Sequence, residues 1–184
     1  MKKISLNIIL GFFLTAISLT AFSQNWDNIS PEECKCAILM PGKPEQAKRT
    51  INHPAYGKLT MNFAILQPKD STDPNLVYML SYTDYPTGTI HSDSTNTLES
   101  FFASSREGAI ANVQGKLLSE TIVNLSGYPG RELRINFKNG LALIRCRNYL
   151  VKNRLYTIQI ITLTENNFNN SINKFLESFK LLTQ

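Results

Sequence analysis

The chain has 184 residues, with 19 lysines and arginines against 14 aspartates and glutamates and a formal net charge of +5 at pH 7. That length suits one domain of ordinary size with a hydrophobic core, and the even spread of apolar residues argues against disorder. A basic excess this small argues against nucleic-acid binding, because nucleic-acid-binding domains carry dense Lys/Arg patches.

The first 23 residues have the features of an export signal. Two lysines precede an apolar run, and the run ends in "AFS" (residues 21–23), with small residues at the two positions that signal peptidase reads. The run is close to the length of a membrane anchor, but Ser, Thr and Asn interrupt it. We therefore predict a cleaved signal peptide, residues 1–23, and one mature domain, residues 24–184, that is periplasmic or secreted.

Alternating apolar and polar residues predict β-strands in the first half of the mature chain. "CKCAILM" indicates a brief strand, and "AKRTINH" and "GKLTMNFAILQ" follow, separated by the turn signal "PAYG". In "GKLTMNFAILQ" the apolar residues recur with period two, which is typical of a strand with one buried face. These residues are Leu59, Met61, Phe63 and Ile65. "LVYMLSYTDYP" repeats the pattern after a polar loop.

In "TLESFFASSREGAIANV" the apolar residues recur at a spacing of three to four, which predicts an amphipathic helix. We expect one of residues 94–96 to cap the start of this helix and Gly115 to end it. Four strand-like runs follow, and Asn139-Gly140 between two of them is a strong hairpin signal. "NNFNNSINKFLESFKLL" predicts a terminal helix. The breaks between the four strand-like runs are short, which indicates an antiparallel meander. The total, seven or eight strands and two helices, predicts an α+β fold in which helices cover an antiparallel sheet.

The stretch "GYPGRELRINF" (residues 127–137) combines a turn signal with a strand pattern. Pro129 and Gly130 suit the two central positions of a type II turn, where the glycine takes a positive φ. Beyond this predicted turn, Arg131 shares one strand face with the apolar residues of the run. Glu132 and Arg134 lie on the other face, which we predict to be solvated.

Six segments, in their order and spacing, carry a resemblance to a known family: "MPGKPE", "LSYTDYP", "LESFFASSREGAIANVQGKLLSE", "GYPGREL", "RNYLVKNRLYTIQI" and "FLESFKLL". The chain from Cys34 to Leu182 resembles bacterial PsbP-related proteins, relatives of the extrinsic photosystem II subunit PsbP. The resemblance implies an α/β/α sandwich around a central antiparallel sheet of about seven strands, with no defined reaction. Photosynthetic members of the family bind other proteins at membranes. The resemblance and the export signal together indicate that the protein comes from a diderm bacterium.

A basic strip is the main candidate for a partner- or anion-binding site. Arg145 and Arg147 share one face of "GLALIRCRNYLV", and Arg154 begins the next strand. We expect Arg134 to lie across from Arg145 or Arg147, and Arg131 stands at the start of its strand. Clustered guanidinium groups offer forked donors to a carboxylate or a phosphate.

The same strip also fits a solvated face that Glu132 and Glu120 neutralise by cross-strand pairing. If the terminal helix packs on this face, the arginines must instead be partly buried and paired. Tyr85, beside a turn, is a second candidate contact for a partner, because exposed tyrosines can anchor partner surfaces.

Three cysteines allow one disulfide after export. Cys34 and Cys36 are awkwardly spaced to bridge each other along a strand, so we predict a bond from Cys146 to one of them. A metal site lacks a fourth ligand with zinc-type spacing, and His53 and His91 lie in turn-like surroundings.

No nucleophile with an adjacent base and no glycine-rich phosphate loop is evident in the sequence. We therefore predict an exported, non-enzymatic accessory or binding domain of the bacterial envelope, without a cofactor. We expect a monomer that binds an unidentified envelope protein, reaches a membrane only through that partner, and binds no nucleic acid. The alternative is a carrier of a small ligand or lipid, with a pocket between the sheet and a helix.

Overall fold

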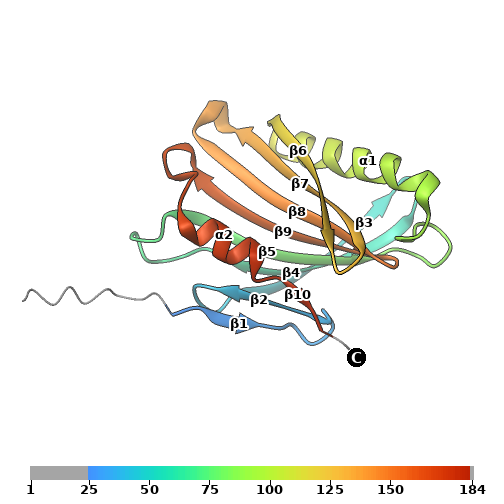
Figure 1. Cartoon of the computed structure of the whole chain (residues 1–184), viewed down its shortest axis with the longest axis horizontal. Helices are drawn as coiled ribbons and strands as arrows, with labels where there is room; N and C mark the ends of the chain where they lie inside the picture. The colour runs from blue at the N-terminus through green and yellow to red at the C-terminus, as the bar shows by residue number, and fades with distance from the viewer. Residues whose placement is uncertain (1–24, 183–184) are drawn as a thin grey trace, which may run out of the picture.

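The computed structural model describes residues 25–182, so the predicted signal peptide lies outside the described residues. Seven strands form one antiparallel sheet in the order β3-β4-β5-β9-β8-β7-β6 (Figure 1). Their bounds are β3 (Glu45–His53), β4 (Gly57–Leu66), β5 (Asn75–Asp84), β6 (Lys116–Leu125), β7 (Tyr128–Phe137), β8 (Ala142–Val151) and β9 (Arg154–Leu163).

Two helices and a small second sheet cover the large one. The helices are α1 (Thr95–Val113) and α2 (Asn170–Glu177), and the small sheet has the order β1-β2-β10, with β1 (Asp27–Ile29), β2 (Cys36–Met40) and β10 (Lys180–Leu181). Two 3₁₀ turns, η1 (Lys138–Gly140) and η2 (Thr164–Asn166), follow β7 and β9. The predicted α+β class, the seven-stranded antiparallel sheet and both helices are confirmed. No helix in residues 25–182 is long and apolar enough to cross a membrane.

The face of the large sheet under α2 and the small sheet holds the largest hydrophobic cluster. Ile172, Phe175 and Leu176 of α2 pack there against β5 and β9, and Ile38 and Met40 of β2 join them. The side chain of Asn169 caps α2 by accepting a hydrogen bond from the backbone N–H of Ile172. We call this side of the sheet the α2 face (Figure 1).

The opposite side, the α1 face, holds two further clusters. Phe101 and Phe102 pack against Leu59 and Leu150 in one, and the last turns of α1 pack over Ile135 and its neighbours in the other. Ser94 precedes α1 but its side chain makes no capping bond, contrary to the expectation of a side-chain cap.

The turn predicted at Pro129-Gly130 is wrong, because the chain reverses at Ser126 and Gly127, which take φ values of 52° and 91°. Gly130 lies inside β7, opposite Tyr149 of β8. A Cβ on Gly130 would lie 2.5 Å from the ring of Tyr149 and 2.6 Å from a backbone oxygen. Glycine is therefore required here for the close approach of two strands, and a Pro-Gly pair alone did not predict this.

Candidate functional site

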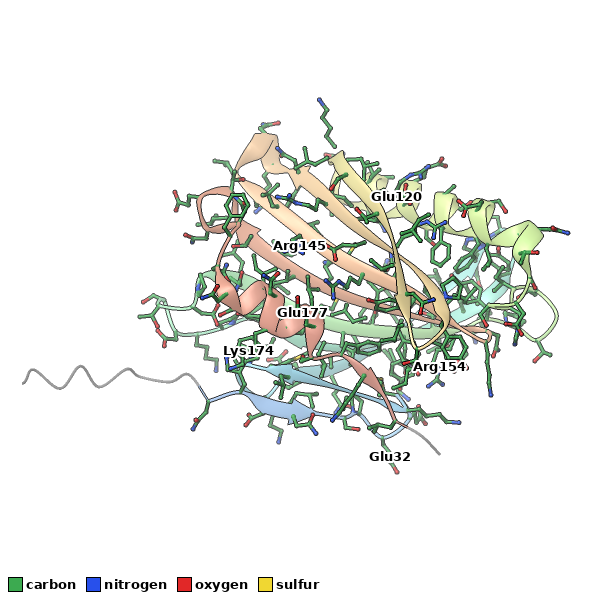
Figure 2. All side chains as sticks on the ribbon, viewed as in Figure 1. Glu32, Glu120, Arg145, Arg154, Lys174 and Glu177 are labelled. Atoms are coloured by element: carbon green, nitrogen blue, oxygen red, sulfur yellow. A yellow bond between two sulfur atoms is a disulfide. The ribbon has the colours of Figure 1, made fainter. Side chains whose placement is uncertain are left out.

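The candidate site lies on the α2 face, where β7 and β8 run beside α2 without being fully covered. The antiparallel register places Arg134 directly opposite Arg145, and Glu132 directly opposite Arg147. We call these four residues the arginine cluster. On the next strand, β6, the small residues Ser119 and Thr121 continue the same face and are exposed. Figure 2 shows Arg145 beside α2.

Glu132 joins two of the three arginines. Its Oε1 accepts a hydrogen bond from Nη2 of Arg145 at 2.7 Å, and its Oε2 accepts one from Nε of Arg147 at 2.6 Å. Burial alone raises the pKa of Glu132, but the hydrogen bonds from Arg147 and Arg145 and their charges outweigh burial and lower the pKa below its usual value. Glu132 therefore stays ionised at neutral pH.

The terminal helix supplies the remaining acceptors. Nη1 of Arg145 donates to Oδ1 of Asn173 at 3.2 Å, and Nη1 of Arg147 donates to the carbonyl of Leu176 at 3.2 Å. The side chains of Arg145, Arg147 and Glu132 are 21%, 18% and 15% exposed. These contacts agree with the expectation that packing of the terminal helix on this face would leave the arginines partly buried and paired.

Arg134 differs from the other two arginines. Its side chain makes no hydrogen bond or ion pair within residues 25–182, and its Nε is buried without an acceptor, as is Nε of Arg145. Like charges directly opposite on neighbouring strands are destabilising, and a buried unsatisfied donor costs about 1–3 kcal/mol. Among the described residues the cluster thus has three guanidinium groups, one carboxylate and two buried Nε donors without an acceptor.

Arg131, a predicted member of the strip, lies on the other side of the sheet. It is buried, forms an ion pair with Glu99 of α1 and lies 4.8 Å from the ring centroid of Phe102. A second carboxylate, Glu120, lies 3.8 Å from its Nε. Arg131 therefore attaches α1 to β7, and it is not available to a partner on the α2 face.

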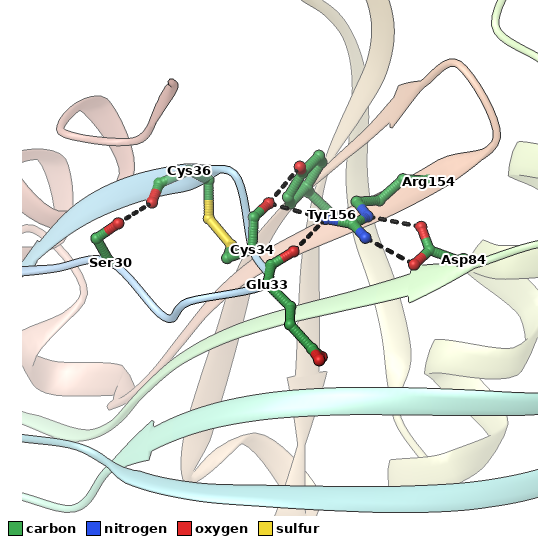
Figure 3. The surroundings of a disulfide bond; sticks show 7 residues. All are labelled: Ser30, Glu33, Cys34, Cys36, Asp84, Arg154 and Tyr156. Atoms are coloured by element: carbon green, nitrogen blue, oxygen red, sulfur yellow. Dashed lines mark hydrogen bonds and ion pairs between the residues drawn. A yellow bond between two sulfur atoms is a disulfide. The ribbon is translucent and has the colours of Figure 1, made fainter. Parts of the chain in front are cut away.

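Arg154 shares the α2 face but lies near the far end of the strands, well apart from Arg145 (Figure 2). Its guanidinium makes two 2.6 Å hydrogen bonds to the carboxylate of Asp84 and also donates to the carbonyl oxygens of Glu33 and Cys34. The hydrogen bonds to Asp84 raise the pKa of Arg154 further above its usual value. Arg154 therefore holds the N-terminal segment on the sheet (Figure 3).

Tyr85 is not an exposed contact, so this prediction is wrong. It is only 9% exposed and packs edge-on against Tyr56 and Phe101 on the α1 face, with ring centroids 5.0 Å and 5.2 Å away. Burial, with a smaller contribution from Tyr56, raises the pKa of Tyr85 to about 12. The helix α1 covers Tyr85, although Tyr85 lies beside a turn. The local sequence does not reveal this long-range contact.

The predicted disulfide to Cys146 is also wrong, because Cys34 and Cys36 bond to each other (Figure 3). Cys34 precedes β2 and is not part of a strand, and Lys35 between the two cysteines has a φ of 56°. Because Lys35 is left-handed and not extended, the two cysteine side chains do not alternate as they would along a strand. Cys146 is a free, buried thiol in the cluster on the α1 face, on the other side of the sheet from the disulfide.

Two crevices bear on the alternative prediction of a small-ligand carrier. One, of about 180 Å³, lies between Pro31 and strands β3 to β5. The other, of about 310 Å³, lies among the loops at residues 87–94 and 152–153. Neither is lined by a residue of α1 or α2, so neither is the predicted pocket between sheet and helix. Residues 25–182 contain no group of three or more His, Cys, Asp or Glu that could hold a metal ion.

The fold resembles that of the solution structure of cyanobacterial PsbP (CyanoP) from Synechocystis sp. PCC 6803. The TM-score is 0.51 and the identity 11%, over 88% of this chain and 95% of that chain. A protein of unknown function from Pseudomonas aeruginosa, PA94, is similar with a TM-score of 0.36 and 11% identity, over 77% of this chain and 85% of that one. No protein-family profile and no curated protein sequence matches the chain. At such low identity the likeness concerns the fold alone, and the predicted PsbP-like fold is confirmed.

Proposed function

We propose that this chain is an exported, non-catalytic accessory domain of the bacterial envelope that binds an acidic segment of a protein partner in the arginine cluster. The PsbP-like fold supports an accessory role, and the apolar N-terminal run behind two lysines supports export. The observation that carries the proposal is Arg134, which lies opposite another arginine and has no partner within residues 25–182.

The chemistry of the cluster favours a carboxylate ligand. Three guanidinium groups face one carboxylate, and the Nε donors of Arg134 and Arg145 are unused. An aspartate or glutamate side chain brings two acceptor oxygens and one negative charge, so it would pair with the guanidinium group of Arg134 and reduce the repulsion between the two arginines. Because the site is partly shielded from water, the interaction is stronger than a fully exposed ion pair.

The same geometry argues for holding an anion rather than moving a proton. Catalysis by a general base at neutral pH needs a pKa near 7, whereas the arginines lower the pKa of Glu132 below that of an ordinary glutamate. Glu132 is therefore a weak base that is already shared between two cations. Its role is to orient Arg145 and Arg147.

The experiment measures binding of a fluorescent oligoglutamate peptide and of inorganic phosphate to two variants. Arg134→Met removes the unpaired guanidinium, and Arg49→Met removes one positive charge from an exposed position of β3. We expect about tenfold weaker peptide binding for Arg134→Met, equivalent to about 1.4 kcal/mol. The thermal midpoint should not fall, because Arg134 makes no hydrogen bond or ion pair in the described part of the chain that would be lost.

Three results would contradict the proposal. Unchanged peptide binding by Arg134→Met would exclude the cluster, and equal losses in both variants would mean that only net charge matters. Tight phosphate binding without peptide binding would make the cluster a site for small anions, and the protein partner would have to be abandoned.

A further inference from the structure

The outer edge of the large sheet at β6 is open to another strand. Within residues 25–182 β6 pairs only with β7, and β3 forms the opposite edge. Natural edge strands usually carry charges, prolines or bulges that prevent pairing with other chains. The β3 edge carries Glu45, Lys48 and Arg49. The second half of β6, residues 121–125, has no charged residue and no proline. It also has no bulge, because the bulge of β6 lies earlier, between Leu117 and Ser119.

The centre of that open segment is suited to pairing. Thr121, Ile122 and Val123 are consecutive β-branched residues, which favour the extended conformation. Ile122 points to the α1 face and is 75% exposed, although it is a large apolar residue in the middle of a regular strand. An added strand would remove this side chain from water and satisfy the free backbone groups of the edge.

The same segment lies next to the arginine cluster. On the α2 face, Ser119 of β6 is opposite Arg134, and Thr121 is opposite Glu132. Only small hydroxyl side chains therefore separate Arg134 from the edge. A strand added to β6 would lie two strand spacings from β7, about 10 Å, and an arginine and a glutamate side chain together span that distance.

We infer that β6 receives an extended segment of the partner protein as an eighth strand of the sheet. The segment carries a carboxylate on the α2 face, where it reaches Arg134, and an aliphatic residue on the α1 face, where it covers Ile122. Backbone hydrogen bonds supply affinity, and the alternating side chains supply specificity. The inference rests on the proposed function and gives the conformation and sequence pattern of the acidic segment.

A second copy of this chain does not fit as the occupant. The residues of β6 that face the α2 side from the bulge onward are Ser119, Thr121, Val123 and Leu125, and none carries a negative charge. Pairing of β6 with β6 would bring another Arg134 to the same face without supplying a carboxylate for either copy. The charges therefore favour an acidic partner of different sequence.

The test uses a synthetic peptide in which glutamate and valine alternate, and a control peptide of the same composition with the glutamates and valines in separate blocks. Hydrogen exchange measures protection of the β6 amides, and fluorescence anisotropy measures affinity. Ile122→Lys places a charge at the centre of the edge, and Thr50→Lys places the same charge on β3. Both positions are exposed, so both variants should fold.

We expect the alternating peptide to slow exchange in β6 and to bind more tightly than the block peptide. Ile122→Lys should weaken its binding by about tenfold, although the added positive charge would by itself attract an acidic peptide. Thr50→Lys should not weaken binding. This combination supports strand addition.

The outcomes separate this inference from the proposed function. If Arg134→Met weakens binding but Ile122→Lys does not, the arginine cluster captures acidic groups without strand addition, and only the inference fails. If Ile122→Lys weakens binding but Arg134→Met does not, the proposed role of the cluster fails, and the predicted carboxylate contact fails with it. Unchanged exchange in β6 at saturating alternating peptide overturns strand addition.

Discussion

Glu132 is the carboxylate that Arg145 and Arg147 share, and it determines how much repulsion the arginine cluster contains. Both of its oxygens accept a hydrogen bond from a guanidinium group. Hydrogen bonds to charged groups contribute more than neutral ones, about 1.5–3 kcal/mol each. The residue therefore stabilises the α2 face, and among the described residues it leaves Arg134 of the cluster without a partner.

Glu132→Gln should lower the free energy of unfolding by about 2 kcal/mol at neutral pH, because two guanidinium groups lose their counter-charge. Glu107→Gln is the matched control. Its carboxylate is 74% exposed and 3.9 Å from Arg106, so the change should be below about 0.5 kcal/mol. Urea denaturation of the three proteins measures both values.

The effect of Glu132→Gln should depend on pH in a defined direction. Because the pKa of Glu132 is lower in the folded protein than its ordinary value, its contribution is complete above the ordinary glutamate pKa. The contribution is lost as the pH falls through the lowered, folded-state pKa, where the wild-type side chain is protonated too. The difference between wild type and variant should therefore shrink in acid. A constant difference down to about pH 3 would contradict the assignment.

The segment before β2 is held to the sheet from several sides. The carbonyl of Cys34 accepts hydrogen bonds from Tyr156 Oη at 2.6 Å and from Arg154, and Ser30 Oγ donates to the carbonyl of Cys36 at 2.9 Å (Figure 3). On the other side, β10 pairs with β2. The disulfide turn is thus part of the layer that covers the α2 face.

We predict that peptide mapping of the unreduced protein finds the bond between Cys34 and Cys36 and a free thiol at Cys146. Burial raises the pKa of Cys146 to about 12, and only the thiolate reacts with alkylating reagents. Iodoacetamide should therefore modify Cys146 in denatured protein and leave it unmodified in folded protein. Recovery of any peptide that links Cys146 to Cys34 or Cys36 would refute this pairing.

The hydrophobic clusters on the two faces share the large sheet. Phe101 is buried on the α1 face and Phe175 on the α2 face. Both clusters include a residue of β8, Tyr149 on the α2 face and Leu150 on the α1 face. The α2 face also has residues of β5, and the α1 face has Tyr85, which directly follows β5. Loss of packing on one face should therefore destabilise the other face as well.

Phe101→Ala and Phe175→Ala should each lower the free energy of unfolding by about 3–5 kcal/mol. Each variant should still unfold in one cooperative transition, in which the fluorescence and circular dichroism midpoints coincide. Phe168→Ala is the control, since Phe168 is 87% exposed. Two separated transitions in either core variant would show that the faces unfold independently.

Local patterns were sufficient for most elements, because strand and helix periods are properties of neighbouring residues. The same period placed Arg131 and Arg134 on opposite faces of β7, as the structure has them. The small sheet escaped prediction because β1 and β10 have only three and two residues, too few to display a period. Gly130 was misassigned because a close strand approach and a turn both require glycine.

Residue patterns alone predicted the order of the longer strands and of both helices and the strand faces that carry the arginines, and they revealed no catalytic motif. The folded structure was needed to show that Tyr85 is covered, that Cys146 lies on the other side of the sheet from the disulfide, and which of the two expected arginines, Arg145, lies opposite Arg134. The reason is physical. Side-chain direction follows from local backbone geometry, whereas burial, charge pairing and disulfide partners depend on segments far apart in the chain that meet only after folding.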